Sequence, residues 1–379
     1  MKRLLSCLLA VTMLLAAPVA LADIPNIAEA DGMTGAILME PGTGTRLWGK
    51  DADMERSVAG LSKLPAILTL AQAFDEGSIS ESTMMRVSEK AAAIAGPTAF
   101  LNANEEIAAR ELIKSAVMIS AGDAIMTLGE TAYGSESIFV ENINVTLRQL
   151  GMNKAMTDAM GNGMLFSPWE LATLGKAAVK SPTFSKYCML YLDAVAHADG
   201  RETELVNANR LIKNYSGCKG VLTGSSATDG YCGVFAAERN GTCLVAVVTG
   251  GENAVKRTAA AVALLDYGFA NYRVETLCKA GNALAKDVPV RDGDVRTVNL
   301  VPREDVVMVT ESKKAKLTLG LEVPEYLEAP VAADVSVGTA TYTDEAGKSV
   351  ATVPLYVERE IPAYGIKDLL LRIIALFIG

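Results

Sequence analysis

Hydrophobic positions follow two different spacings along this chain, and the change between them divides it into two regions. Up to about Arg273, short apolar strands alternate with helices in which apolar residues recur every three or four positions. Beyond Tyr272 helical spacing stops, and short β-rich runs separated by Gly and Pro take its place. We therefore predict an α/β domain over residues 23–273, a small β domain over 274–360 and a separate terminal segment over 361–379.

The first elements of the α/β region are a hairpin and a helix. A strand at Gly35–Met39 and a second strand starting at Arg46 flank the turn Gly42–Thr45. Gly60 then breaks the chain, and apolar residues at helical spacing predict a helix through about Phe74. The other predicted elements are a buried helix within Glu105–Gly122, a helix between Gly134 and Leu150, a helix capped by Ser167 with Pro168 at its first position, strands at Val221–Gly224, Gly230–Ala237 and Leu244–Val248, the hairpin turn Arg239–Gly241, and a long helix at Ala254–Gly268.

The small β domain is predicted from six apolar runs bounded by turn residues. They are Asp287–Arg291, Val295–Val301, Asp305–Thr310, Lys316–Leu321, Ser336–Tyr342 and Val350–Val357.

Both ends of the chain carry targeting patterns. Residues 1–22 have the charged start, apolar core and A-x-A site of a secretory signal, which makes Asp23 the first mature residue. A lipoprotein-type cleavage before Cys7 is the alternative. In the terminal segment, Asp368, Arg372, Ala375 and Gly379 recur at 4-3-4 spacing opposite a wide apolar face. This pattern is typical of a helix lying on a membrane surface, and the alternative is a helix packed on its own protein.

Charge and the rarer residues exclude several functions. Removing Lys2 and Arg3 leaves 33 basic against 44 acidic residues, a net charge of −11, which argues against a nucleic-acid partner. The five remaining cysteines are an odd number at spacings that match no zinc motif, so we expect no metal and no cofactor. They are either partly paired or buried free thiols. The single histidine, His197, has no nucleophile motif near it and is interpreted as a loop or helix-end residue.

Several local sequences, taken in order, resemble the serine-type D-alanyl-D-alanine carboxypeptidases, the low-molecular-mass penicillin-binding proteins. The resemblance is carried by the hairpin Gly35–Asp51 and by the segments Glu111–Ala124, Asn209–Leu211 and Leu265–Tyr272. It implies a penicillin-binding-protein/β-lactamase-like transpeptidase domain, an antiparallel sheet flanked by helices, then a small all-β domain and a C-terminal amphipathic helix.

The resemblance also places three catalytic motifs on this sequence, and each has lost one chemical group. The S-x-x-K motif falls on Gly60 and Lys63, so the nucleophilic serine is absent. The S-x-N motif falls on Ser120 and Gly122, without the asparagine that holds the substrate amide. The K-T-G motif falls on Leu222, Thr223 and Gly224, without the lysine that attracts the terminal carboxylate.

The surviving groups have alternative roles. Lys63 is either a base or a helix-start lysine, Ser120 either a proton relay or the cap of the following helix, and Thr223 either a substrate contact or an ordinary strand residue. Ser62 points away from the direction of Gly60 on a helix, and Lys219 lies on the opposite strand face from Leu222. Neither neighbour replaces a lost group.

Three hypotheses follow from this pattern. The first is an exported, catalytically degenerate carboxypeptidase relative at the extracytoplasmic face of the membrane, binding peptidoglycan stem peptides or a cell-wall partner. The second is an active carboxypeptidase that removes terminal D-alanine through an unrecognised nucleophile. The third is a structural membrane-surface module in which the β domain holds a partner.

Overall fold

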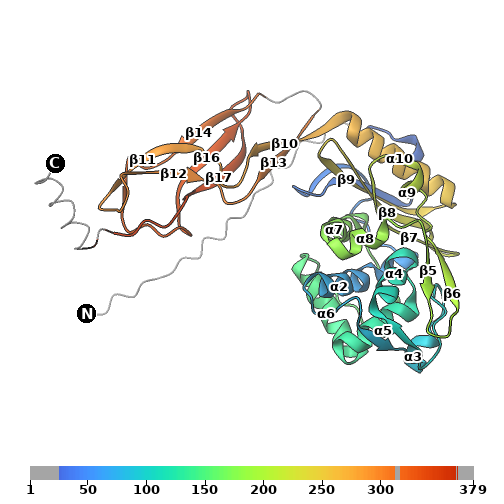
Figure 1. Cartoon of the computed structure of the whole chain (residues 1–379). Helices are drawn as coiled ribbons and strands as arrows, with labels where there is room; N and C mark the ends of the chain where they lie inside the picture. Colours follow the sequence, from blue (N-terminus) through green and yellow to red (C-terminus); the bar gives the residue numbers. More distant parts are fainter. Residues whose placement is uncertain (1–24, 312–315, 364, 366–379) are drawn as a thin grey trace, which may run out of the picture.

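The computed structural model describes residues 25–311, 316–363 and 365, and it contains two folded domains. Figure 1 shows the helix-rich domain joined to an elongated β domain at the end of one long helix. This helix, α10 (Ala254–Asn271), is followed directly by β10 (Tyr272–Cys278). The predicted signal segment and the terminal amphipathic segment from residue 366 onward lie outside the described residues.

The first domain mixes helices and strands. In chain order its elements before α10 are α1 (Ala28–Asp31), β1 (Gly35–Glu40), β2 (Thr45–Lys50), the 3₁₀ helix η1 (Ala59–Lys63), α2 (Leu64–Asp75), β3 (Met84–Arg86), α3 (Glu89–Ala92), β4 (Glu106–Ala108), α4 (Ala109–Ile119), α5 (Gly122–Tyr133), α6 (Glu136–Gln149), α7 (Pro168–Lys180), α8 (Pro182–Cys188), β5 (Leu192–Ala196), β6 (Glu202–Val206), α9 (Leu211–Asn214), β7 (Cys218–Ser226), β8 (Gly230–Arg239) and β9 (Thr242–Gly251).

An antiparallel five-stranded sheet in the order β2-β1-β9-β8-β7 forms the centre of this domain. Every residue of β1 is buried, because alternate side chains enter two different cores. Ile37 packs into the large core shared with α2, α4 and α7. Leu38 packs on the other face with Leu264 of α10. The predicted α/β fold, a sheet flanked by helices, is confirmed.

The hairpin between β8 and β9 follows from its turn residues. Asn240 and Gly241 both have positive φ, 51° and 77°, as a two-residue Asn-Gly turn requires. The helix cap at Ser167 is also present. Its hydroxyl accepts the Glu170 N–H while the Glu170 carboxylate accepts the Ser167 N–H, a complete capping box.

The buried helix predicted within Glu105–Gly122 is present, and it is shorter than that stretch. The helix expected within Glu105–Gly122 begins only at Ala109, because Glu106–Ala108 forms β4 and pairs with β3. The helix ends at Ile119, where Ser120 adopts a left-handed conformation. The strand partner lies about twenty residues earlier, so local periodicity carries no signal for it.

The second domain begins with β10, and its elements in the described residues after β10 are all strands. They are β11 (Ala285–Arg291), β12 (Thr297–Val301), β13 (Val306–Glu311), β14 (Thr318–Glu322), β15 (Leu327–Glu328), β16 (Ser336–Thr343) and β17 (Ser349–Val357). Six of them form one sheet in the order β14-β16-β17-β12-β11-β15, while β10 pairs with β13. The two sheets share one core, and the Tyr342 hydroxyl of β16 donates to the Leu277 carbonyl of β10 at 3.0 Å.

Hydrogen bonds join the domains near the start of β10. The Val274 N–H donates to Thr242 Oγ1 at 3.2 Å, and the Tyr272 hydroxyl donates to the Leu47 carbonyl at 3.4 Å. No helix in the described part of the chain is both long enough and apolar enough to cross a membrane.

Candidate active site

The turn that carries Gly60 packs directly against strand β7. A Cβ placed on Gly224 would lie 2.8 Å from the Gly60 nitrogen, so only glycine fits at position 224. The reverse does not hold. A Cβ placed on Gly60 meets only the Gly224 Cα, at an ordinary contact distance of 3.7 Å. There is therefore room for a side chain at position 60, and its absence is not required by packing.

Lys63 closes the 3₁₀ turn and points into the protein. Its side chain is buried, and Nζ donates a hydrogen bond to the Ser120 carbonyl at 3.0 Å. Burial lowers the pKa of Lys63 below its ordinary value, and the negative charge of Asp123 partly opposes this. Asp123 is itself fixed, because its carboxylate accepts the backbone N–H groups of Ala99 and Leu101. The amine is thus held in a desolvated position next to the other motif residues.

Ser120 ends helix α4 in a left-handed conformation, with φ 56° and ψ 40°. Its N–H bonds the Ala116 carbonyl, and helix α5 takes Ala121 as its N-cap without a side-chain bond. The hypothesis that Ser120 caps the following helix is therefore wrong. Its buried hydroxyl has no hydrogen-bond partner among the described residues. A buried hydroxyl without a partner is energetically unfavourable, which is typical of a site that once had another group or that receives a ligand.

The space beside Gly122 is occupied. A Cβ at this position would lie 2.6 Å from Ile94 Cγ2, 3.3 Å from Met160 Sδ and 3.4 Å from Lys63 Nζ. The first distance is shorter than any real contact, so an asparagine does not fit without movement of Ile94. Ile94 and Met160 are site residues that the sequence did not indicate, because both lie in irregular segments without periodic spacing.

Leu222 is part of the large hydrophobic core and is only 3% exposed. The next residues, Thr223 and Gly224, are partly exposed. They pair with Gly233 and Cys232 on β8, and β7 is an edge strand of its sheet. Position 222 therefore holds an apolar core side chain, while Thr223 and Gly224 stay paired within the sheet.

Ser62 and Lys219, the neighbours of motif positions 60 and 222, already have other partners. Ser62 Oγ donates to the Met160 carbonyl at 3.0 Å. Lys219 lies on the surface, where Nζ is 3.2 Å from Glu238 Oε2. No side-chain group at these two positions is available to act as a nucleophile or as a carboxylate receptor at the site.

His197 lies in the turn between β5 and β6, as the sequence predicted for a loop residue. Its side chain is fully buried, with Nδ1 2.6 Å from Glu105 Oε1 and Nε2 2.8 Å from Thr203 Oγ1. The buried ring has no exposed face for a substrate. We infer that it holds the β5–β6 hairpin against the loop that contains Glu105.

The five cysteines in the described ranges are free thiols, so the interpretation with partial pairing is wrong for this structure. Within residues 25–311, 316–363 and 365, no group of His, Cys, Asp and Glu side chains is arranged to hold a metal ion.

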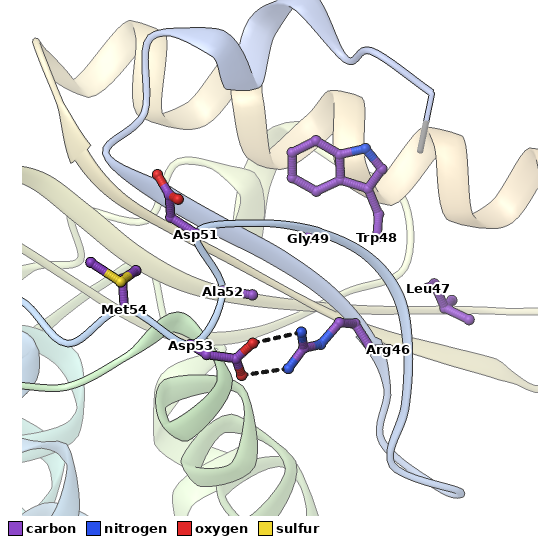
Figure 2. Close-up of a pocket in the computed structure, with 8 residues that line it drawn as sticks. All are labelled: Arg46, Leu47, Trp48, Gly49, Asp51, Ala52, Asp53 and Met54. Carbon is purple, nitrogen blue, oxygen red and sulfur yellow. Dashed lines mark hydrogen bonds and ion pairs between the residues drawn. The ribbon is translucent and has the colours of Figure 1, made fainter. Parts of the chain in front are cut away.

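A cavity of about 360 Å³ lies away from the three motifs, along β2 and the turn that follows it. Figure 2 shows Arg46 and Asp53 facing each other there in a two-pronged ion pair, with nitrogen–oxygen distances of 2.8 and 2.6 Å. The Arg46 guanidinium also lies 4.9 Å from the centre of the Trp169 ring. These contacts tie β2 and the following turn to the first turn of α7.

The fold and the three motif positions define an α/β penicillin-binding domain followed by a β domain. Comparison with known proteins agrees with this class. Residues 25–253 match the family model of D-alanyl-D-alanine carboxypeptidase, and residues 272–363 match that of the penicillin-binding protein 5 C-terminal domain. The chain belongs to the D-alanyl-D-alanine carboxypeptidase family of peptidoglycan metabolism.

Individual relatives match almost the whole chain. It is 30% identical to D-alanyl-D-alanine carboxypeptidase DacF of Bacillus subtilis, over 98% of both chains. It is 26% identical to DacA of Escherichia coli strain K12, over 89% of this chain and 86% of that one. Among solved structures, penicillin-binding protein 5 of Haemophilus influenzae superposes with a TM-score of 0.77 at 23% identity, covering 89% of this chain and 98% of that chain.

Proposed function

We propose that this protein is a catalytically silent member of its family that binds peptidoglycan stem peptides, or a cell-wall partner, without cleaving them. The observation that carries the proposal is Gly60, which has no side-chain oxygen at the nucleophile position. Without a nucleophile the covalent route is lost entirely and not merely slowed. The nearby Ser62 hydroxyl is bonded to the Met160 carbonyl and offers no substitute.

The other two motifs support the same conclusion. Ile94 and Met160 occupy the place where an asparagine at position 122 would lie. Leu222 packs into the core where the family has a lysine. Both observations fit the proposal that the protein no longer depends on catalysis.

Binding without turnover is supported by what remains. Strand β7 keeps an edge position, and an extended peptide binds such an edge through main-chain hydrogen bonds. Thr223 and Gly224 are partly exposed on this strand. The Ser120 hydroxyl is buried and has no partner among the residues described, so a bound peptide amide is a suitable partner for it.

We further propose that the chain acts outside the cytoplasm and contacts the membrane surface. The secretory pattern of residues 1–22 and the amphipathic pattern of residues 366–379 support this location. The test is truncation after Ala363. The shortened protein should remain folded and move from the membrane fraction to the soluble fraction. A truncated form that still sediments with membranes contradicts the anchor.

The test of the silent site combines covalent labelling with peptide binding. The wild-type protein should show no mass increase with a penicillin and should release no D-alanine from a stem-peptide mimic. Calorimetric titration should nevertheless detect binding of the mimic, and a control peptide that ends in L-Ala-L-Ala should bind more weakly. A stable penicillin adduct on any serine would favour the active carboxypeptidase. Absence of both labelling and peptide binding would favour the structural module.

A further inference from the structure

Strand β14 forms one border of the β domain and pairs with β16 alone (Figure 1). In the part of the chain that the structure describes, no strand lies on its other side. All of its residues are exposed, including Leu319 and Leu321, each 41% exposed. A border strand of this kind presents free N–H and C=O groups to which a further strand can bind.

The two faces of β14 differ in character. Leu319 lies opposite Tyr342 and Leu321 lies opposite Ala340, and both of these partners are buried in the core of the β domain. The leucines therefore extend the apolar inner face of the sheet to its border. Thr318, Gly320 and Glu322 lie opposite three threonines and form the outer, solvent-facing side.

The sequence from Lys316 to Glu322, KLTLGLE, is complementary to itself when read in the opposite direction. If two copies pair antiparallel about a two-fold axis at Leu319, then Leu317 faces Leu321 of the other copy. Lys316 then faces Glu322 at both ends of the pairing. We propose that β14 is the contact through which a second copy of this chain binds, joining two six-stranded sheets into one.

The chemistry of the edge favours this partner over an arbitrary peptide. Cross-strand leucines and opposite charges each stabilise an antiparallel pair, and a two-fold axis provides both twice. Within one copy, Lys316 Nζ lies 3.6 Å from Glu345 Oε1. Both side chains are mostly exposed, so this ion pair is weak and Lys316 can pair with Glu322 of the second copy instead. One short pair of strands buries less surface than the roughly 1,200–2,000 Å² that is buried in stable complexes. We therefore expect weak, concentration-dependent association.

A charge-exchange experiment on the purified full chain tests the proposal. Lys316→Glu places two glutamates at each end of the self-pairing, and Glu322→Lys places two lysines there. Each variant alone should associate at least tenfold more weakly than wild type in sedimentation equilibrium at low salt. An equimolar mixture should recover association, because every facing pair is then of opposite charge. Variants that self-associate like wild type, or a mixture no better than either variant, would overturn the proposal.

A cysteine placed on the two-fold axis tests the register without changing any charge. Leu319→Cys should form a disulfide-linked dimer under mild oxidation. Thr318→Cys is the matched control, because residue 318 faces Gly320 of the other copy. The two cysteines at position 318 would then lie roughly 8 Å apart, too far for a disulfide. Equal cross-linking of the two variants, or none by Leu319→Cys although circular dichroism shows it folded, would overturn the proposed register.

Discussion

Ile94 occupies the space in which a side chain at Gly122 would begin, with its Cγ2 only 2.6 Å from the position of a Cβ there. We predict that Gly122→Asn lowers the free energy of unfolding by about 1–3 kcal/mol, the usual effect of overpacking. Adding Ile94→Ala should reduce this loss, so the two substitutions are non-additive. Urea denaturation of wild type, both single variants and the double variant measures the coupling. Additive effects would mean that Ile94 does not restrict position 122.

The second prediction concerns the nucleophile position. Gly60→Ser has room for its side chain, because the nearest atom to a new Cβ is Gly224 Cα at 3.7 Å. We expect the fold to tolerate it within about 0.5 kcal/mol. Penicillin acylation should remain slow at most, since substrate misplacement by about an ångström reduces the rate on the order of 100-fold.

Restoration of the other groups provides the comparison for Gly60→Ser. The combined variant adds Gly122→Asn, Leu222→Lys and Ile94→Ala, where the last change makes room for the asparagine. It should acylate and release D-alanine clearly faster than the single variant, because such groups act together. Equal rates for the two variants would mean that only the serine matters.

The third prediction follows from the burial of Leu222. Leu222→Lys alone should lower the free energy of unfolding by about 2–5 kcal/mol, since it removes core packing and buries an ammonium group. Leu222→Met keeps the volume and should lose less than about 1.5 kcal/mol. Thermal or chemical denaturation separates the two. A stable Leu222→Lys would show that the lysine still reaches solvent at the site.

The fourth prediction concerns the pH dependence of stability. Burial lowers the pKa of Lys63 from the ordinary 10.5, so the unfolded chain binds more protons than the folded one between the lowered pKa and 10.5. In that range the free energy of unfolding rises with pH. The stability that Lys63 contributes at high pH is lost as the pH falls through its lowered pKa. Relative to Lys63→Met, the wild type should therefore gain stability from neutral pH toward 10.5. A difference that is independent of pH would contradict a desolvated amine.

Features with local causes were predictable from the sequence. Ser167 and Pro168 determine the start of α7 through a cap and a fixed φ. Asn240 and Gly241 determine the turn between β8 and β9 through their tolerance of positive φ. The motif spacing likewise predicts Gly60, Lys63 and their counterparts as site positions. Each of these signals lies within a few residues along the chain.

The tertiary structure decided what surrounds those positions. β4 forms because it finds β3, and the contact of Ile94 with position 122 arises only when two irregular segments meet. The missing partner of the Ser120 hydroxyl is equally a property of packing. The sequence by itself determined which residue types stand at the three motif positions, because residue identity and spacing are local. Only the folded chain decided which side chains surround those positions, because contacts between distant segments depend on packing that no local pattern encodes.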